Sequence, residues 1–232
     1  MGENDRSFVE SRGEIIIQTL GLKSYREVWD LQKNLFDKLL AAKSNGTANH
    51  DNYLITCQHN HVITLGKSGN ESNIQVPEFP GVEYIRIDRG GDITYHGPGQ
   101  LVVYPILDLE QFGMSLRQYI NHLEQSVINT LRFYGLNAGR IKEYTGVWIN
   151  PESSAPKKIA AIGVKCSRHV TMHGMAFNIK PDLKYYDLII PCGIIGKEVT
   201  SLEKEMGQEV DFEEVKARYM TCFSKLFGDR IG

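Results

Sequence analysis

The chain has 232 residues, with 26 lysines and arginines against 28 aspartates and glutamates, so its formal net charge is −2. Hydrophobic residues make up 41% and charged residues 23%, as in an ordinary globular protein, which excludes a disordered or fibrous chain. The near-neutral balance argues against a general nucleic-acid binder. The longest apolar stretch, 188–195, is far shorter than the ~20 residues that a membrane span needs.

The start of the chain, Met1 to Ser7, lacks the apolar core of a secretory signal. The four cysteines are widely spaced and form no Cys-x-x-Cys pair: Cys57, Cys166, Cys192 and Cys222. This pattern favours free thiols over a disulfide framework. We therefore expect a cytoplasmic protein, and a monomer.

Three helices are predicted from caps and apolar periodicity. Ser24 and Glu27 form a capping box before a run at helical spacing that stops at 44–46. Ser115 and Gln118 repeat the box before a second run that stops at Gly135. A third helix is expected over 211–227.

β-Rich segments lie between these helices, at 52–58, 61–65, 82–88, 93–95, 101–107, 146–149, 158–166, 172–179 and 188–191. They cluster between helices instead of alternating with them, which favours an α+β fold with a mixed or antiparallel sheet. Two polar, proline-containing stretches read as loops, 150–157 and 67–81, and the second could be a lid. We expect a polar tail over 1–13 and one catalytic domain over 14–232.

The segment from Arg89 to Gln100 is the densest chemical signal, because its glycines allow close approach of the backbone and its polar side chains can bind a ligand. A pair of turns that carries polar side chains but binds no ligand would have the same composition. It is not a dinucleotide fingerprint, since Val102 replaces the third glycine. Gly66-Lys67-Ser68 is not a phosphate loop either, since His61 stands where that motif needs glycine.

A zinc site is a weaker possibility. Cys57, His59 and His61 alternate, so along a strand they would project from one face, as metal ligands can. The spacing shows no second ligand pair, and we expect no metal.

Two further segments contain potential catalytic groups. Lys158 opens an apolar strand, where an ammonium can be partly desolvated. Cys192 stands between Pro191 and Gly193 after an apolar run, where a turn could present a nucleophile. Most lysines are nevertheless solvated, and most free cysteines are small buried hydrophobic residues.

Together these segments resemble the lipoyl(octanoyl) transferase family from about residue 14 to about residue 202. The family signature, Arg-Gly-Gly-x-x-Thr-aromatic-His-Gly-Pro-Gly-Gln leading into a strand with Tyr-Pro, fits residues 89–105 throughout. Matching segments follow in the family's order at 59–66, 145–148, 158–163, 173–178 and 191–193. A small departure is Gln58-His59-Asn60, where family members often have Glu-His-Pro.

The resemblance implies an α+β domain of the biotin/lipoate protein ligase type that transfers an octanoyl group from acyl carrier protein to a lysine of a lipoyl domain. Expected acceptors are lipoyl domains of 2-oxoacid dehydrogenase complexes and the glycine cleavage H protein, with no cofactor. Cys192 matches the acyl-thioester nucleophile and Lys158 its partner. The residues that match the acyl site are Arg89, Gly90, Gly91, Asp92, Ile93, Thr94, Tyr95, His96, Ala161, Ile162, Gly163, Gly174, Met175 and Ala176.

The chemistry agrees with this assignment. A cysteine with a pKa of ~8.5 needs a nearby cation or base, and Lys158 can stabilise the thiolate and exchange protons. His96 and His173 are rival bases, but the family match favours Lys158 and leaves them to position substrate. Amides around Cys192 or Gly163 can stabilise the tetrahedral oxyanion.

Two alternatives remain from the sequence. An ATP-dependent lipoate ligase on the same fold would have His followed by Asp instead of His96-Gly97, and it needs no Cys192. A non-catalytic module that binds lipoyl domains or acyl carrier protein would not need Lys158. Since such partners are acidic, we also expect a basic rim built from Arg140, Lys142, Lys157, Lys165 and Arg168.

Overall fold

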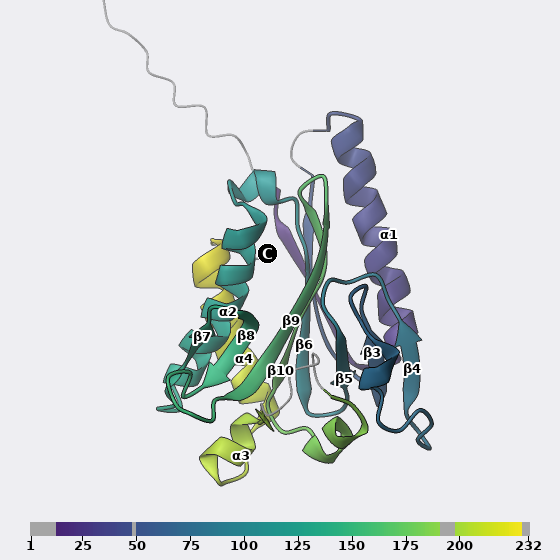
Figure 1. Cartoon of the computed structure of the whole chain (residues 1–232). Helices are drawn as coiled ribbons and strands as arrows, with labels where there is room; N and C mark the ends of the chain where they lie inside the picture. Colours follow the sequence, from purple (N-terminus) through teal and green to yellow (C-terminus); the bar gives the residue numbers. More distant parts are fainter. Residues whose placement is uncertain (1–12, 48–49, 191–197, 229–232) are drawn as a thin grey trace, which may run out of the picture.

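The computed structural model describes residues 13–47, 50–190 and 198–228. Its main sheet has eight strands in the order β1-β2-β6-β10-β9-β8-β7, and β11 lies beside β9 (Figure 1). These strands are β1 (Ile15–Lys23), β2 (Asn52–His59), β6 (Gln100–Ile106), β7 (Ala138–Ile141), β8 (Tyr144–Ile149), β9 (Lys157–Ser167), β10 (Val170–Asn178) and β11 (Glu198–Val199). A small second sheet has the order β4-β3-β5, with β3 (Val62–Leu65), β4 (Glu83–Arg86) and β5 (Ile93–His96).

Helices cover both faces of the main sheet (Figure 1). Helix α1 (Tyr25–Ser44) packs on β10, β6 and β2, on the side where the small sheet lies. On the other side, α2 (Leu116–Arg132) contacts β7, β8, β9 and β10, and α4 (Phe212–Phe227) packs on α2. The remaining helical elements are short: α3 (Leu202–Met206), η1 (Glu71–Asn73), η2 (Leu109–Phe112) and η3 (Leu183–Leu188).

The largest hydrophobic core lies between the main sheet and the α2–α4 pair. Leu123 and Val127 of α2 and Phe223 of α4 are fully buried there against Val103 and Phe177 of the sheet. A second core joins α1 to the opposite face of the sheet. The α+β class with a mixed sheet is therefore confirmed, because β1 and β2 run parallel while β6, β10, β9 and β8 run antiparallel.

The three predicted helices are confirmed as α1, α2 and α4, and their caps explain where they begin. The Ser115–Gln118 capping box is complete in both directions. In α1 only half of the box forms: the Ser24 hydroxyl accepts from the Glu27 amide, whereas the Glu27 carboxylate pairs with Lys23 at 2.9 Å. Asp211 caps α4 by accepting from two backbone amides.

Most predicted strands are also confirmed, but three differences stand out. Three strands, β1, β7 and β11, were not expected from the sequence. The predicted strand over 188–191 is wrong in its described part, since Leu188 ends the 3₁₀ helix η3 and Ile189 forms a single bridge with Ile74. The apolar side chains of this run pack against the small sheet instead. The expected lid over 67–81 contains η1, and Gln75 donates to the Leu188 carbonyl at 2.8 Å.

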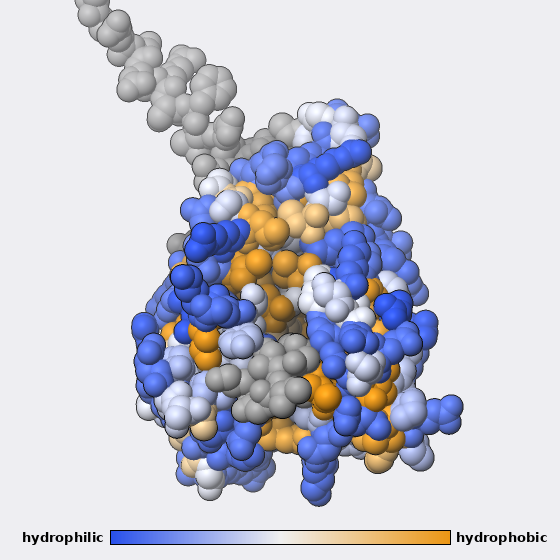
Figure 2. Space-filling view, viewed as in Figure 1, coloured by the Kyte–Doolittle hydropathy of each residue, from blue (hydrophilic) through white to orange (hydrophobic). Residues whose placement is uncertain are grey.

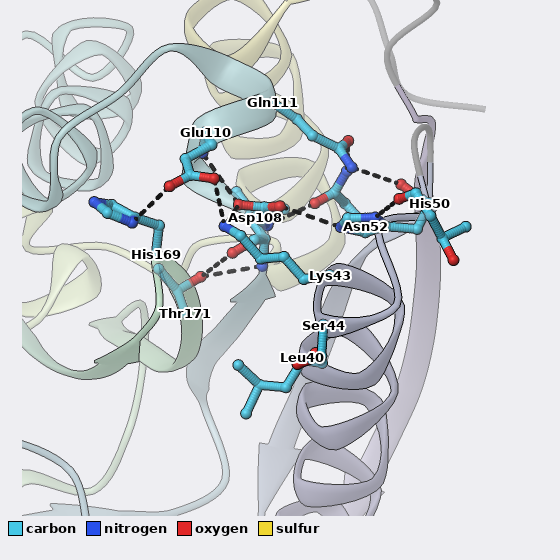
Figure 3. A network of polar contacts seen from close by, with 12 residues as sticks. Leu40, Lys43, Ser44, His50, Asn52, Asp108, Glu110, Gln111, His169 and Thr171 are labelled. Carbon is cyan, nitrogen blue, oxygen red and sulfur yellow. Dashed lines mark hydrogen bonds and ion pairs between the residues drawn. The ribbon is translucent and has the colours of Figure 1, made fainter.

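A polar network closes one end of the main sheet (Figure 3). The Asp108 carboxylate, which is nearly buried, accepts from Lys43 of α1 at 2.5 Å. The same ammonium pairs with Glu110, and Glu110 pairs with His169 in the β9–β10 turn. This network ties α1 to the β9–β10 hairpin, and its residues do not line the cavity described below.

A helix that spans a membrane must be both long and apolar. Within 13–47, 50–190 and 198–228, every helix is too short or too polar to cross a bilayer.

Candidate active site

A cavity of about 590 Å³ opens beside strands β9 and β10. Figure 2 shows apolar side chains gathered in a hollow at the centre of this face, ringed by hydrophilic ones. The cavity is lined by segments far apart in the sequence, namely Tyr25, Ser68, Arg89–Thr94, His96, Tyr104, Ile120, Glu143–Thr145, Lys158, Ala161–Val164 and His173–Ala176. Its size suits a small ligand with a long apolar part.

The glycine-rich segment is held in place by its own first and fourth residues. The buried Arg89 guanidinium donates to the Thr64 carbonyl at 2.9 Å and to the Thr64 hydroxyl at 3.0 Å. Asp92 accepts from the Asn70 amide at 3.1 Å and from the Asn73 side chain at 2.6 Å. Both charged residues therefore fix the loop that covers the cavity.

Strand β9 presents backbone groups to the cavity at Ile162. The β9–β10 hairpin closes with a two-residue turn between Ser167 and Val170, which form a hydrogen-bonded pair. Counted back from this turn, the opposed residues of β9 and β10 alternate between hydrogen-bonded and non-hydrogen-bonded pairs. By this alternation Gly163 bonds to Gly174, whereas the N–H and C=O of Ile162 point to the open edge. The Gly90 amide donates to the Val164 carbonyl at 2.9 Å on that same edge, which supports the alternation. The Gly163 amide expected as an oxyanion donor therefore faces Gly174, whereas the Ile162 amide faces the opposite edge of β9, on which the Gly90 amide bonds to Val164.

Gly163 itself allows the glycine-rich segment to lie directly on β9. A Cβ at this position would come within 2.9 Å of both the Arg89 Cδ and the Gly90 carbonyl oxygen. Any larger residue would therefore push the Arg89 segment off the strand.

His96 is buried and neutral. Gln100 uses its NH₂ to donate to the Tyr95 carbonyl and to Asn178, so its Oε1 accepts from His96 Nδ1 at 3.2 Å. The remaining ring nitrogen lies 3.5 Å from the Thr64 hydroxyl. Burial, followed by the nearby His59 and Arg89, holds the pKa of His96 well below its ordinary value. Both nitrogens are thus engaged, which weakens His96 as a catalytic base.

His173 forms a dyad with Asp88 in the cavity wall. His173 Nε2 donates to the Asp88 carboxylate at 2.9 Å, and the other carboxylate oxygen accepts from Lys165 at 2.6 Å. Burial lowers the pKa of His173 despite this carboxylate. The hydrogen bond from His173, aided by Lys165, in turn holds the pKa of Asp88 well below its usual range. The backbone of His173 is left-handed, with φ of 61°. This neutral, oriented imidazole suits the positioning of substrate.

The three residues considered as zinc ligands, Cys57, His59 and His61, do not form one cluster. His59 donates from Nδ1 to the Lys23 carbonyl, and its Nε2 accepts from the Tyr104 hydroxyl at 2.8 Å. Cys57 lies 3.6 Å from the same nitrogen. His61 lies beyond the turn after β2 and stacks on Tyr185 in a different cluster. The prediction that the three share a face is therefore wrong. Among the described residues no group of three or more histidine, cysteine and acidic side chains could hold a metal ion.

Lys158 lies in the cavity wall and is only 8% exposed. It is the second residue of β9, and Val199 of β11 is its parallel partner. The Thr200 amide donates to the Lys158 carbonyl at 2.9 Å. The chain that follows residues 191–197 thus runs directly beside this lysine.

Cys192, with Pro191 and Gly193, lies outside the described residues. The residues on either side are anchored to the cavity wall. Before the gap, the Ile190 amide donates to the Asn73 carbonyl at 2.7 Å, and Asn73 bonds to Asp92. After it, Val199 pairs with Lys158.

Every described residue that the resemblance assigns to the acyl site lines this cavity, except Tyr95. Alternation along β5 places Thr94 and His96 on one face and Tyr95 on the other, where its hydroxyl meets His61 at 2.8 Å and its ring stacks on Tyr185. Sequence reasoning missed several lining residues whose segments only the fold brings together: Tyr25, Ser68, Tyr104, Ile120, Glu143, Tyr144, Thr145 and Val164. For Thr145 and Tyr104 a signal existed, since both fall in segments that match the family.

The expected basic rim is largely neutralised within the chain. Arg140 pairs with Glu124, Lys157 with Glu205 and Lys165 with Asp88, at 2.6 to 2.8 Å. Arg168 donates to the Ser44 hydroxyl at 2.8 Å. Three of the five expected cations therefore have an acidic partner within the chain, whereas Arg168 contacts a neutral hydroxyl and Lys142 forms none of these ion pairs.

Comparison with solved structures defines the fold. A bi-partite lipoate protein ligase from Thermoplasma acidophilum has the same fold, with a TM-score of 0.61 at 18% sequence identity over 93% of this chain and 83% of that chain. At this identity the likeness concerns the fold alone. The architecture is that of an α+β lipoate protein ligase domain.

Sequence comparison gives the family. The lipoyl protein ligase A/B catalytic domain matches residues 24–224. The octanoyltransferase of Bacteroides fragilis (strain YCH46) is 50% identical over 198 residues, which cover 84% of this chain and 89% of that protein. The octanoyltransferase of Christiangramia forsetii is 46% identical over 224 residues, 92% of this chain and 96% of that protein. The chain belongs to the lipoyl(octanoyl) transferases of this family.

Proposed function

We propose that this acyltransferase takes an octanoyl group from octanoyl-acyl carrier protein, holds it as a thioester on Cys192 and passes it to a lysine of a lipoyl domain. Octanoyl transfer in protein lipoylation follows from the family, which acts on lipoyl domains. The carrier-protein donor, the thioester and the particular acceptors, namely lipoyl domains of 2-oxoacid dehydrogenase complexes and the glycine cleavage H protein, are the proposed parts. No cofactor is needed for this scheme.

One observation carries the proposal: a nearly buried lysine in the wall of an apolar cavity, beside the chain that follows Cys192. Lys158 is 8% exposed, and Val199, seven positions after Cys192, is its strand partner. On the other side Ile190, two positions before Cys192, is bonded through Asn73 to the cavity wall. Both described segments that flank residues 191–197 are therefore joined by hydrogen bonds to the cavity wall, at Lys158 directly and at Asp92 through Asn73, which supports Cys192 as the nucleophile.

The other cysteines fit a nucleophile poorly, which also favours Cys192. Cys57 and Cys222 are each 4% exposed, in hydrophobic surroundings. Burial raises the pKa of the Cys57 thiol, and it also raises the pKa of the half-buried Cys166. A thiol whose pKa is raised supplies little thiolate at neutral pH.

The reaction divides into two balanced steps. In the first, the Cys192 thiolate attacks the donor thioester carbonyl, the new C–S bond forms, and the pantetheine thiol leaves with a proton. In the second, the acceptor lysine amine attacks the enzyme thioester, the amide forms, and the Cys192 thiol is released as the amine loses its proton. Lys158 stabilises each thiolate and relays the proton. In this scheme the Ile162 amide donates to the tetrahedral oxyanion.

The assay that tests this proposal follows the mass of a lipoyl domain incubated with octanoyl-acyl carrier protein and the enzyme. We expect one octanoyl group to be added without ATP, no transfer by Cys192→Ser, and normal transfer by the matched control Cys166→Ser. Transfer from free octanoate that requires ATP would instead identify a ligase. Transfer that survives in Cys192→Ser would remove the thioester from the scheme.

A further inference from the structure

The side chain of Lys158 lies across the indole ring of Trp148. Its Nζ is 5.0 Å from the ring centroid, within the ~6 Å at which a cation is attracted to an aromatic face. Trp148 is 1% exposed, so this contact is sheltered from water. A cation–π contact is stronger in such a desolvated place than at the surface.

The indole is itself fixed. Trp148 Nε1 donates to the Tyr144 carbonyl at 3.1 Å, and the Tyr144 ring lies 6.0 Å away. Trp148 and Lys158 are directly opposed in the β8–β9 pair, so their side chains share one face of the sheet. Rotation of the ring away from the lysine would therefore break its hydrogen bond to the Tyr144 carbonyl.

The backbone on either side of this pair is shaped to place the lysine. Val147 pairs with Ala160 and Trp148 with Lys158, so Ile159 is an extra residue on β9, which is a β-bulge. Bulges re-aim the neighbouring side chain. Gly146 adjoins the lysine stem, because a Cβ there would lie 3.1 Å from Lys158 Cε.

We propose that Trp148 is a positioning residue, whose indole face holds the Lys158 ammonium charged and in place at the cavity wall. Burial alone favours the neutral amine. An aromatic face favours the ammonium and does nothing comparable for the neutral amine. The role of this ammonium toward Cys192 rests on the proposed function, but the Trp148–Lys158 contact does not.

The primary experiment titrates the ε-carbon NMR resonance of Lys158 in protein made with isotopically labelled lysine. The resonance is assigned by its loss in Lys158→Arg. We expect Trp148→Leu to lower the pKa of Lys158 and Trp148→Phe to lower it less, because phenyl is a weaker partner than indole. If Trp148→Leu does not fold, Trp148→Phe decides alone. A Lys158 titration that is the same in these variants and in the wild type overturns the proposal.

The chain offers a matched control in its other tryptophan. Lys33 Nζ lies 4.6 Å from the Trp29 ring centroid on α1. Trp29→Leu removes a contact of the same kind elsewhere, so it should leave the Lys158 titration unchanged. If Trp29→Leu changes the pKa of Lys158 as much as Trp148→Leu does, the change is a general effect of losing a tryptophan, and the proposal is overturned.

A second readout separates this proposal from the proposed function. The pH dependence of Cys192 alkylation should show a lower thiolate fraction in Trp148→Leu at neutral pH, by at most about thirty-fold, which corresponds to the strongest cation–π contacts. Adding Trp148→Leu to Lys158→Ala should change nothing further. If the pKa of Lys158 shifts in Trp148→Leu while the pH dependence of Cys192 alkylation does not change, the placement of the ammonium by Trp148 stands and its coupling to Cys192 is wrong.

Discussion

Lys158 is 8% exposed in the wall of an apolar cavity. In the proposed reaction its ammonium stabilises the Cys192 thiolate, because opposite charges within ~4–6 Å favour each other's charged form. Lysine and cysteine in the proposed reaction therefore activate each other.

Removing the charge of Lys158 tests this dependence. Lys158→Ala should raise the pKa of the Cys192 thiol by about one to three units, the range for an ion at such a distance. Lys158→Arg should keep part of the shift but lose proton relay, since guanidinium does not deprotonate. Alkylation rates of Cys192 against pH measure both. A wild-type thiol that titrates near ~8.5 and ignores both variants would contradict the activation.

The residues of the site were only partly predictable from the sequence. Family motifs assigned Arg89, His96 and Ile162 to the cavity, where they lie. Tyr95 does not line the cavity, because a motif gives adjacent residues without their faces and the side chains of Thr94 and Tyr95 point to opposite sides of β5. Tyr25 was missed because its helix meets the site only through tertiary packing.

Among the elements, the β8–β9 pair is the one that shapes the site. Its register shifts by one residue beside Lys158, and Gly146 has φ of 127°, which L side chains rarely adopt. The buried Glu124 of α2 holds this point, accepting from the Gly146 amide at 3.0 Å and from Arg140 at 2.7 Å. The position of Lys158 thus depends on a helix as well as on two strands.

Gly146→Ala should damage this junction. Its Cβ would lie 2.5 Å from the Ala160 carbonyl oxygen, in a backbone conformation that strains alanine. We expect a loss of about 1 to 3 kcal/mol in unfolding free energy and a larger proportional loss of transfer rate. Urea unfolding and the transfer assay measure these effects. Gly135→Ala, also at positive φ but beyond α2 and with no neighbour within 4 Å, is the control. It should strain the backbone while leaving transfer intact, and equal losses of transfer in both variants would contradict this role.

Elements with a local signal were predicted, and those defined by packing were not. Complete caps and apolar periodicity sufficed for α2 and α4. Edge strand β1 was missed because its exposure does not alternate cleanly and its register shifts between Thr19 and Leu22. An apolar run such as 188–190 is compatible both with a strand and with a buried 3₁₀ turn. The packing of Leu188 against the small sheet decides between the two.

At the scale of the whole molecule, three buried imidazoles make the fold sensitive to acid. Burial lowers the pKa of His59 to about 4, although its hydrogen bond to Lys23 opposes this. Burial likewise lowers the pKa of His173 and, more strongly, that of His96. The unfolded chain, with imidazole pKa values of ~6.5, therefore binds more protons than the native state below that pH.

These lowered pKa values make the native state less stable in acid. Stability from these groups is complete above about pH 6.5 and falls as the pH drops toward 4, by up to ~1.4 kcal/mol per pH unit for each imidazole. We expect about 2 kcal/mol to be lost through His59 between about pH 7 and about pH 5, and further losses of the same sign through His96 and His173. Urea unfolding at the two pH values measures this, and His59→Gln should make the slope shallower. A free energy of unfolding that stays constant over this range would contradict the account.

The central claim is that one enzyme-bound thioester on Cys192 connects donor and acceptor. The most direct measurement isolates the enzyme after brief incubation with octanoyl-acyl carrier protein, removes the donor, and records intact masses before and after a lipoyl domain is added. We predict one hydroxylamine-labile octanoyl group on Cys192 that moves completely to the lipoyl domain without ATP. An adduct on Cys57, Cys166 or Cys222, or an acyl-enzyme that cannot pass its octanoyl group on, would contradict the claim.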